Sequence, residues 1–149
     1  MKRFLPDESA TQQLGAELAE RSHGGEVIYL VGNLGAGKST LVRGFLGALG
    51  HSGAVKSPTY TLIEPYEFPD RRVLHLDLYR LADPGELEYL GVRDLSTADT
   101  CLLIEWPEQG AGYLPQPDLI VRLEYRGQAR EATLEARTAA GRRCLKGAD

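Results

Sequence analysis

The stretch YLVGNLGAGKST, residues 29–40, decides which fold the rest of the chain must build. It fills the pattern G-x-x-x-x-G-K-[ST] without a mismatch, and the fixed positions are Gly32, Gly37, Lys38 and Ser39. At average residue usage, a chain of 149 residues matches this pattern by chance on the order of once in a few hundred. The pattern is typical of a phosphate-binding loop that joins a strand to a helix, so the neighbouring residues must supply both.

The segments on either side of the loop have the periodicity that the motif requires. EVIYLV, residues 26–31, is an apolar, largely β-branched run that is typical of a buried strand. After the loop, apolar residues recur at helical spacing from Leu41 to Leu49, and Gly50 is a typical helix end. The sequence therefore predicts strand, loop and helix in that order.

Further strands and helices are predicted along the rest of the chain. Strands are expected around residues 61–67, 72–79 and 101–105, and a hairpin is expected over residues 118–136 with its bend at residues 126–128. Ser9 and Gln12 have the spacing of a capping box at the start of a first helix, and Asp83-Pro84 predicts the start of a short one. These elements predict an α/β fold with a mixed sheet.

Composition and charge limit the classes of protein to consider. The chain is 42% hydrophobic and 26% charged, values that are ordinary for one soluble globular domain. It carries a formal net charge of −4, so autonomous nucleic-acid binding is not expected. The arginine pairs at 71–72 and 142–143 are interpreted as a solvated turn and a solvated tail.

The ends of the chain and its cysteines favour a cytoplasmic protein. No apolar run approaches the roughly 18 residues that suggest a membrane span, and the first residues, MKRFLPDESATQQLG, do not form a secretory signal. Cys101 and Cys144 suggest neither a disulfide framework nor a metal site. A reducing cytoplasm is the expected location.

The predicted loop has the chemistry to bind ATP with Mg²⁺. Glycines allow backbone N–H groups to turn toward phosphate oxygens, and the positive end of the following helix faces the same anion. Lys38 is expected to reach the β- and γ-phosphates, and the Ser39 hydroxyl is expected to bind Mg²⁺. Only four of the 17 basic residues are lysines, so a lysine inside the loop indicates a specific requirement. The expected nucleotide-binding residues of the loop are Asn33, Leu34, Gly35, Ala36, Gly37, Lys38, Ser39 and Thr40.

Two acidic residues are candidates for holding or orienting the magnesium. Glu105 comes directly after the apolar run CLLI, and Asp77 lies in VLHLDLY, where alternation places it on the polar face of a half-buried strand together with His75. A solvated acid at a strand end is the alternative for either residue. Glu105 is the preferred metal ligand, because an acid directly after an apolar run is harder to explain by exposure alone.

A hydroxyl-rich segment, KSPTYTL at residues 56–62, follows the loop and its helix. In nucleotide switches, a threonine in such a segment senses Mg²⁺ and the γ-phosphate. From these residues alone, an ordinary Ser/Thr-rich turn is the favoured interpretation.

Four motifs, taken together, resemble the TsaE family, also called YjeE. They are GNLGAGKST at 32–40, KSPTYTLIEPY at 56–66, LHLDLYRLADPGELEYLGVRD at 74–94 and LLIEWPEQG at 102–110. The likeness runs from about residue 5 to residue 135, and HLDLYRL and SPTYTL are far more specific than the phosphate loop. The resemblance implies a small bacterial P-loop ATPase with a three-layer α/β fold, a mixed, largely central β-sheet and a single domain spanning residues 1–149.

The resemblance also implies roles for individual residues. Lys38 and Ser39 match the phosphate and Mg²⁺ positions, Glu105 looks like the second magnesium residue, Asp77 matches the other functional acid, and Thr59 matches a switch-like catalytic threonine. Asp7 and Arg130 fall where the family closes over the nucleotide. Trp106 lies beside the implied site.

The implied task is support of tRNA threonylcarbamoyladenosine synthesis. ATP hydrolysis would sustain a transferase pair, TsaD and TsaB, and tRNA would be contacted only through that complex. Two other classes share the loop. A small-molecule kinase would need a second pocket and an Arg-bearing lid, and no Arg-rich insertion is present; a GTP-dependent switch would carry N-K-x-D, which the sequence lacks.

Overall fold

The computed structural model describes residues 1–58 and 61–145. The strands in these residues are β1 (Lys2–Leu5), β2 (Val27–Val31), β3 (Ile63–Glu67), β4 (Arg72–Asp77), β5 (Thr100–Glu105), β6 (Leu119–Arg126) and β7 (Ala129–Ala136). The helices are α1 (Glu8–Arg21), α2 (Lys38–Ala48), α3 (Gly85–Tyr89) and α4 (Ala139–Leu145), with the 3-10 helices η1 (Val92–Leu95) and η2 (Pro107–Gly110).

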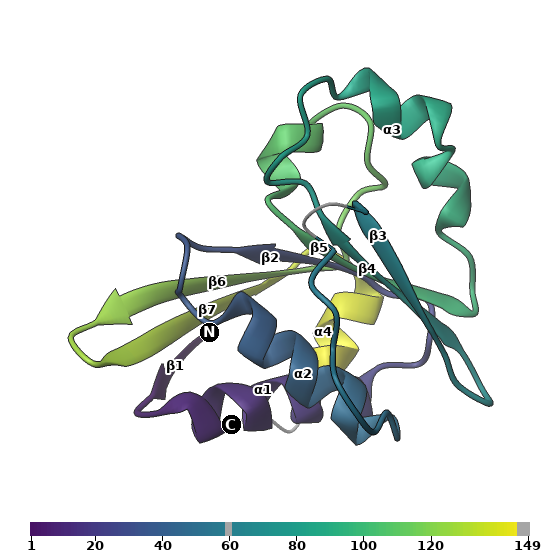
Figure 1. The fold of residues 1–149 in the computed structure, drawn as a ribbon. Coiled ribbons are helices and arrows are strands. Elements are labelled where there is room, and N and C mark those ends of the chain that lie inside the picture. The colour runs from purple at the N-terminus through teal and green to yellow at the C-terminus, as the bar shows by residue number, and fades with distance from the viewer. Residues whose placement is uncertain (59–60, 146–149) are drawn as a thin grey trace.

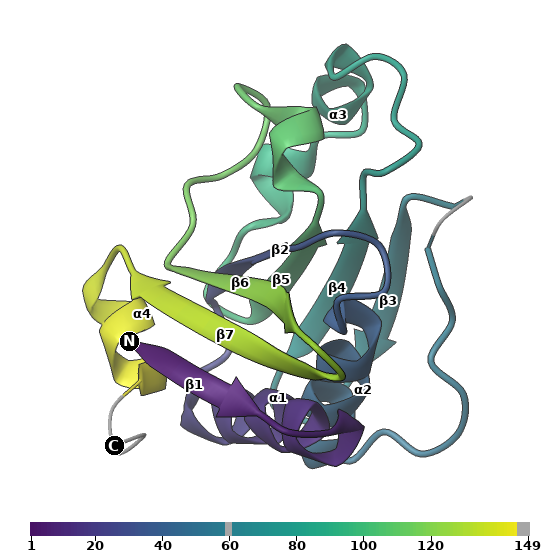
Figure 2. The ribbon, with the colours of Figure 1, turned by 90° about the vertical axis from the view of Figure 1, so that its left-hand side faces the viewer.

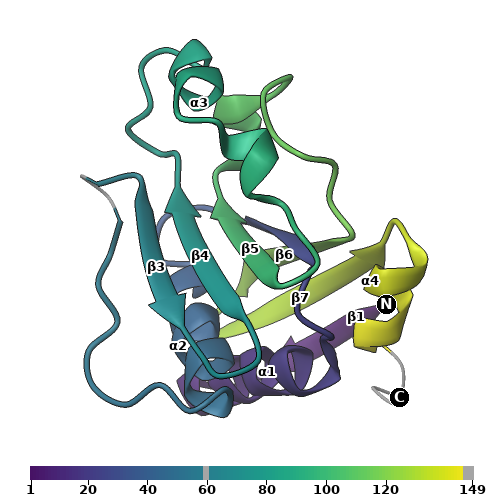
Figure 3. The same cartoon turned by 90° about the vertical axis from the view of Figure 1, so that its right-hand side faces the viewer.

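The strands form one mixed sheet in the order β1-β7-β6-β2-β5-β4-β3. The four central strands, β6, β2, β5 and β4, are parallel, while β3, β7 and β1 add antiparallel pairs at the two sides. β4 and β5 end at the edge of the sheet that faces α3 (Figure 3). Because the carboxyl ends of parallel strands meet at one edge, side chains that follow β2, β4 and β5 are brought together there.

Helices cover both faces of the sheet, which gives the expected three layers. Helices α1, α2 and α4 lie on one side, and α3 lies with the two 3-10 helices on the other (Figure 1). Two apolar clusters correspond to these faces: Phe45 and Leu46 of α2 pack against Leu30 and Leu103, whereas Leu87 of α3 belongs to the other cluster. The predicted three-layer α/β fold with a mixed, central sheet is confirmed.

Close packing between α1 and α2 fixes the position of the helix that follows the glycine loop. A Cβ atom on Gly44 of α2 would lie 2.0 Å from the Gln12 carbonyl oxygen, and one on Gly15 of α1 would lie 2.1 Å from the Leu41 carbonyl oxygen. Only glycine allows this separation at either position, because real Cβ contacts do not fall below 3.0 Å. The two helices are therefore held at backbone contact.

Two elements and one helix start differ from the prediction. β1 pairs with β7 (Figure 2), and α4 lies at the end of the described chain; the sequence analysis predicted neither. Helix α1 begins after Asp7, whose carboxylate accepts a hydrogen bond from the Ala10 N–H at 2.8 Å, so the predicted Ser9 cap is wrong. Asp7 is the stronger cap because it is extended and directly precedes the first helical residue.

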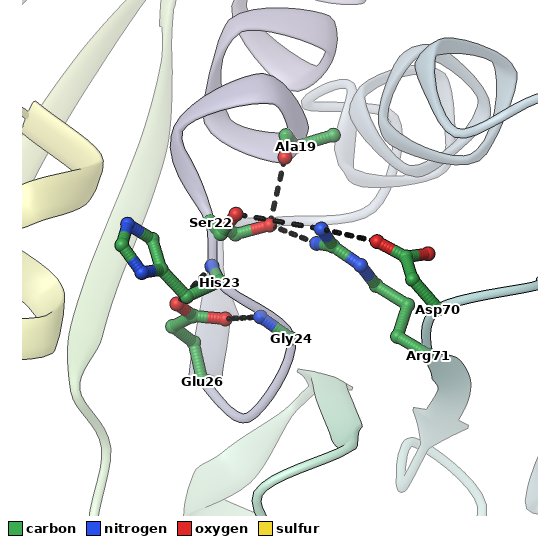
Figure 4. Close-up of polar contacts among 7 residues, drawn as sticks. All are labelled: Ala19, Ser22, His23, Gly24, Glu26, Asp70 and Arg71. Atoms are coloured by element: carbon green, nitrogen blue, oxygen red, sulfur yellow. Dashed lines mark hydrogen bonds and ion pairs between the residues drawn. The ribbon is translucent and has the colours of Figure 1, made fainter.

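The interpretation of Arg71 as part of a solvated turn is also wrong. Its side chain is only 9% exposed, and its guanidinium donates to the Ser22 hydroxyl at 2.5 Å at the end of α1 (Figure 4). Within the loop between α1 and β2, the buried Glu26 accepts from the His23 and Gly24 N–H groups. The Arg71 bond therefore joins the β3–β4 turn to a loop that Glu26 holds in shape.

None of the helices in residues 1–58 and 61–145 combines the length and the apolar character that a membrane crossing requires.

Candidate functional site

The glycine loop, residues 32–37, joins the end of β2 to the start of α2 as the sequence predicts. Gly35 has φ +79° and Gly37 has φ +111°, values in the left-handed region that side chains other than glycine rarely adopt. Gly37 also forms the N-terminal cap of α2. The loop therefore turns its backbone around the N-terminus of a helix, an arrangement that binds anions.

Lys38, the first residue of α2, points back along the loop. Its side chain is buried, its Nζ donates to the Gly32 carbonyl oxygen at 2.6 Å, and the same Nζ lies 3.8 Å from the centroid of the Trp106 ring. Burial lowers the pKa of Lys38, while the nearby carboxylates of Glu105 and Asp77 oppose that shift. An ammonium group held among acids and an aromatic face is well placed to exchange these partners for an anionic ligand.

The two candidate acids lie opposite each other at the ends of neighbouring parallel strands. Asp77 of β4 is in register with Glu105 of β5, so both side chains project from the face of the sheet that α2 covers. Both are buried, at 8% and 4% exposure. Burial raises the pKa of Asp77, and the Tyr79 N–H, which donates to its carboxylate at 3.0 Å, opposes the shift.

The strand that carries Asp77 is buried more deeply than predicted. Alternation correctly separates Leu74 and Leu76 from His75 and Asp77, but both faces of β4 are covered. The half-buried strand of the sequence prediction is therefore wrong, because α2 packs over the face that the pattern suggested was exposed. For both acids, the alternative of a solvated strand-end position does not hold.

A cleft of about 540 Å³ opens beside these groups, and we call it the carboxylate cleft. Its lining combines the glycine loop and start of α2 with residues from the ends of β4 and β5: Leu34, Gly35, Gly37, Lys38, Ser39, Thr40, Ser57, Asp77, Tyr79, Arg80, Glu105 and Trp106. The lysine, the serine hydroxyl and the two acids therefore face one space.

A second cleft of about 340 Å³ lies on the other side of the glycine loop, and we call it the hairpin cleft. It is lined by Leu5, Asp7, Glu8, Thr11, Gly35, Ala36, Gly37, Thr40, Gln128 and Arg130. The Arg130 guanidinium donates to the Gly35 carbonyl oxygen at 3.2 Å, and its Cζ lies 4.4 Å from the centroid of the Tyr125 ring. The Tyr125 hydroxyl in turn donates to the Leu34 carbonyl oxygen. The β6–β7 hairpin is thus bonded to the tip of the loop.

The structure brings most of the predicted site residues to these two clefts. Asn33 is the exception within the loop: it is exposed and borders a separate hollow beside Trp106. Asp7 borders the hairpin cleft and also caps α1. The predicted switch residue Thr59 lies outside the described residues.

Three contacting residues received no role from the sequence. Tyr125 of the β6–β7 hairpin bonds the loop across some ninety positions, which leaves no local signal, and Gln128 of the same hairpin lines the hairpin cleft. His75 lies within hydrogen-bonding distance of Glu105. The alternation of VLHLDLY already placed His75 on the same face as Asp77, and this pattern is the signal that could have identified it.

The groups present fit a nucleoside triphosphate bound with Mg²⁺. A Cβ on Gly35 would lie 2.9 Å from the Tyr125 hydroxyl oxygen, so the loop has room for backbone alone. Within residues 1–58 and 61–145, no three His, Cys, Asp or Glu side chains gather into a metal site. The cleft instead offers one hydroxyl, from Ser39, and two carboxylates, from Asp77 and Glu105. Proteins usually bind Mg²⁺ with few side chains of this kind, and the phosphates of the ligand complete the coordination.

Comparison with known proteins assigns the family. The model of the family described as "Threonylcarbamoyl adenosine biosynthesis protein TsaE" matches residues 5–134. The chain belongs to the TsaE family. A Haemophilus influenzae relative named "tRNA threonylcarbamoyladenosine biosynthesis protein TsaE" is 44% identical over 150 residues, covering 97% of this chain and 95% of the relative. A Synechocystis relative of the same name is 42% identical over 120 residues, covering 78% of this chain and 73% of the relative.

A solved structure agrees with the TsaE assignment of the fold. The crystal structure of Bacillus subtilus YdiB is similar to this TsaE family member with a TM-score of 0.80 and 28% sequence identity. The match covers 98% of this chain and 91% of the YdiB chain. The sheet that positions the two clefts is therefore shared with a solved protein over nearly the whole chain.

Proposed function

We propose that this chain is a Mg²⁺-dependent ATPase of a single domain that supports tRNA threonylcarbamoyladenosine synthesis, with TsaD and TsaB as its partners. Membership of the TsaE family and the names of its relatives support the pathway. The observation that carries the ATPase assignment is the convergence of Lys38, Asp77 and Glu105 on one cleft beside the glycine loop. The place of action is the cytoplasm, where tRNA is modified.

The residues of the glycine loop and α2 would bind the triphosphate. Backbone N–H groups of the loop and of the first turn of α2 would donate to the phosphates, and Lys38 would exchange the Trp106 ring and the Gly32 carbonyl oxygen for phosphate oxygens, whose charge it would neutralise. Asp7 and Arg130, on the hairpin side of the loop, would close over the nucleoside.

Ser39 and Glu105 would hold Mg²⁺, which supplies charge neutralisation on the phosphate oxygens when bound. Asp77, whose pKa is raised by burial, lies beside them and would accept a proton or orient water at the same place. Thr59, by its position in the sequence after α2, would sense the occupied site.

The openness of the site and the charge of the chain support dependence on partners. Both clefts open to solvent at the surface of the molecule, and a P-loop site of this kind is completed by groups from a partner in many NTPases. The net charge of −4 disfavours direct binding of tRNA, so tRNA is contacted through the transferase pair. The isolated chain should therefore hydrolyse ATP slowly.

The test is ATP hydrolysis by the purified chain, alone and with the TsaB–TsaD pair, with Lys38→Ala as the blank. We expect slow turnover alone, strong stimulation by the pair, and loss of both in Lys38→Ala. Rapid turnover that ignores the pair would refute the partner-coupled role while leaving the nucleotide chemistry intact. Formation of a phosphorylated metabolite in place of free phosphate would indicate a kinase instead.

A further inference from the structure

His75 lies beneath the carboxylate cleft, in the layer between the sheet and α2. It is 1% exposed, and its Nε2 lies 2.5 Å from a carboxylate oxygen of Glu105. The two side chains come from neighbouring parallel strands, with Glu105 two positions beyond the residue that is in register with His75. His75 does not line the cleft itself, but it contacts Glu105, which does.

The hydrogen bonding of His75 identifies which ring nitrogen carries the proton. Its Nδ1 is buried and has no hydrogen-bond partner among the described residues. If the proton were on Nδ1, that N–H would be an unpaired buried donor, and the Nε2 lone pair would face carboxylate oxygen. The tautomer with its proton on Nε2 avoids both costs, so His75 donates to Glu105.

This hydrogen bond restricts the orientation of the Glu105 carboxylate. One oxygen is held from beneath by an imidazole that is itself fixed in the core, on the same face as Val73 and Leu103. The hydrogen bond thereby limits the rotation of a carboxylate that itself lines the cleft. In proteins, groups that hydrogen-bond a metal ligand in this way fix its geometry, and removing them commonly costs about ten- to a hundred-fold in metal affinity.

We propose that His75 is the positioning residue for Glu105, and that it presents this carboxylate to the magnesium–triphosphate complex without touching the ligand itself. The inference rests on the proposed function, since it assigns Glu105 to the metal. It predicts that a donor at the position of the imidazole Nε2 is required for Mg²⁺-dependent binding and is not required for binding of the triphosphate without metal.

Three substitutions separate this role from general support of the core. His75→Leu removes the donor and keeps an apolar side chain in the core, whereas His75→Gln can place an amide N–H near the position of Nε2. Val73→Ala, on the same strand and face two residues earlier, makes a cavity without touching Glu105. Each variant would be followed by thermal unfolding with ATP in EDTA and with ATP at increasing Mg²⁺.

We expect all three variants to keep the stabilisation by ATP in EDTA. His75→Leu should need about ten-fold more Mg²⁺, or more, to reach half of the additional Mg²⁺-dependent stabilisation. His75→Gln should recover most of that loss, and Val73→Ala should unfold at lower temperature with an unchanged Mg²⁺ midpoint. An unchanged midpoint in His75→Leu, or an equal shift in Val73→Ala, would overturn the proposal.

A second measurement on the nucleotide-free chain keeps the inference testable if His75→Leu does not fold. The ¹⁵N chemical shifts of the His75 ring report its tautomer, and we expect the proton on Nε2, with a clear change in that signal in Glu105→Gln. A proton on Nδ1 alone, with Nε2 unprotonated, would overturn the proposal. If the wild-type chain shows no stabilisation by ATP at all, the proposed function fails, and the ring signal still decides whether His75 holds Glu105.

Discussion

The ammonium group of Lys38 lies 3.8 Å from the centroid of the Trp106 ring while donating a hydrogen bond to the Gly32 carbonyl oxygen. Trp106 has φ +56°, a left-handed value that is uncommon for a large side chain, so the contact is held by a constrained backbone. Because Trp106 is the only tryptophan in the chain, its fluorescence reports on the surroundings of this one ring, which Lys38 and Tyr79 both contact.

We therefore predict that ATP changes the tryptophan fluorescence and that Lys38→Ala weakens ATP binding by about ten- to a hundred-fold, the loss expected when one charged hydrogen-bond donor is removed. The measurement is a fluorescence titration with ATP. Lys56→Ala is the matched control, because Lys56 is also a lysine near α2 but is exposed and does not line the carboxylate cleft. Equal weakening in both variants would contradict the role assigned to Lys38.

Glu105→Gln should impair the Mg²⁺-dependent part of ATP binding while leaving binding in EDTA unchanged. The substitution keeps the shape of the side chain and removes the negative charge that a hard cation prefers. Titration of Mg²⁺ at constant ATP measures the effect, and a midpoint raised about ten-fold or more is expected. Glu108→Gln, at an exposed acid three residues later, should keep the wild-type midpoint. If Glu105→Gln also keeps it, Asp77 is the metal residue.

Arg130→Ala should weaken ATP binding several-fold without a comparable loss of stability. The guanidinium, which lies on the exposed hairpin, donates a hydrogen bond to the Gly35 carbonyl oxygen. A hydrogen bond from a charged group stabilises a protein by about 1.5–3 kcal/mol when it is buried and by less at the surface. Calorimetric titration with ATP measures the change. Arg126→Ala is the control, since Arg126 lies on the same hairpin but pairs with Glu131 and lines neither the carboxylate cleft nor the hairpin cleft. Equal losses would indicate a general effect of hairpin charge.

The backbone contact between α1 and α2, which fixes the position of α2, can be tested by substitution. Gly44→Ala places a methyl group 2.0 Å from the Gln12 carbonyl oxygen, so α1 and α2 must separate, and we expect a loss of about 1–3 kcal/mol in the free energy of unfolding. Gly47→Ala, one turn later in the same helix, meets nothing within 4 Å and should gain up to about 1 kcal/mol. Urea unfolding of both variants measures the difference, and a stabilising Gly44→Ala would refute the contact.

The parts of the fold that the sequence predicted are those with a strong local pattern. The loop, β2 and α2 follow from the glycine motif and its flanks, and β4 and β5 follow from apolar runs. β1 and α4 did not follow, because a four-residue strand and a short C-terminal helix are stabilised by pairing with β7 and by packing of Cys144, which are contacts distant in sequence. The Ser9 cap failed because Asp7, two residues earlier, begins the helix by accepting from the Ala10 N–H.

In the candidate site, too, the residues within a strong local pattern could be predicted and those placed by distant contacts could not. Lys38, Ser39 and Glu105 are adjacent to decisive local patterns, so their places in the carboxylate cleft could be predicted. Tyr125 reaches the loop only through the hairpin, and the buried state of His75 depends on α2 packing over β4, so neither role could be predicted from neighbouring residues. The residues that orient the site are thus less visible in the sequence than the residues that would bind the ligand.

The buried Cys144 thiol makes the stability of the chain depend on pH in the alkaline range. Burial raises its pKa from the ordinary 9.0 to about 12, and Glu26 and Asp118 act in the same direction. Between those pH values the unfolded chain has lost the thiol proton and the folded chain has kept it, so the free energy of unfolding falls as pH rises above 9 and is independent of this group below 9. Urea unfolding at pH 8 and pH 10 should therefore show a larger fall for the wild-type chain than for Cys144→Ala. The other cysteine and the tyrosines titrate in both proteins, so the difference isolates Cys144, and equal falls would mean that this thiol ionises in the folded chain as readily as in the unfolded one.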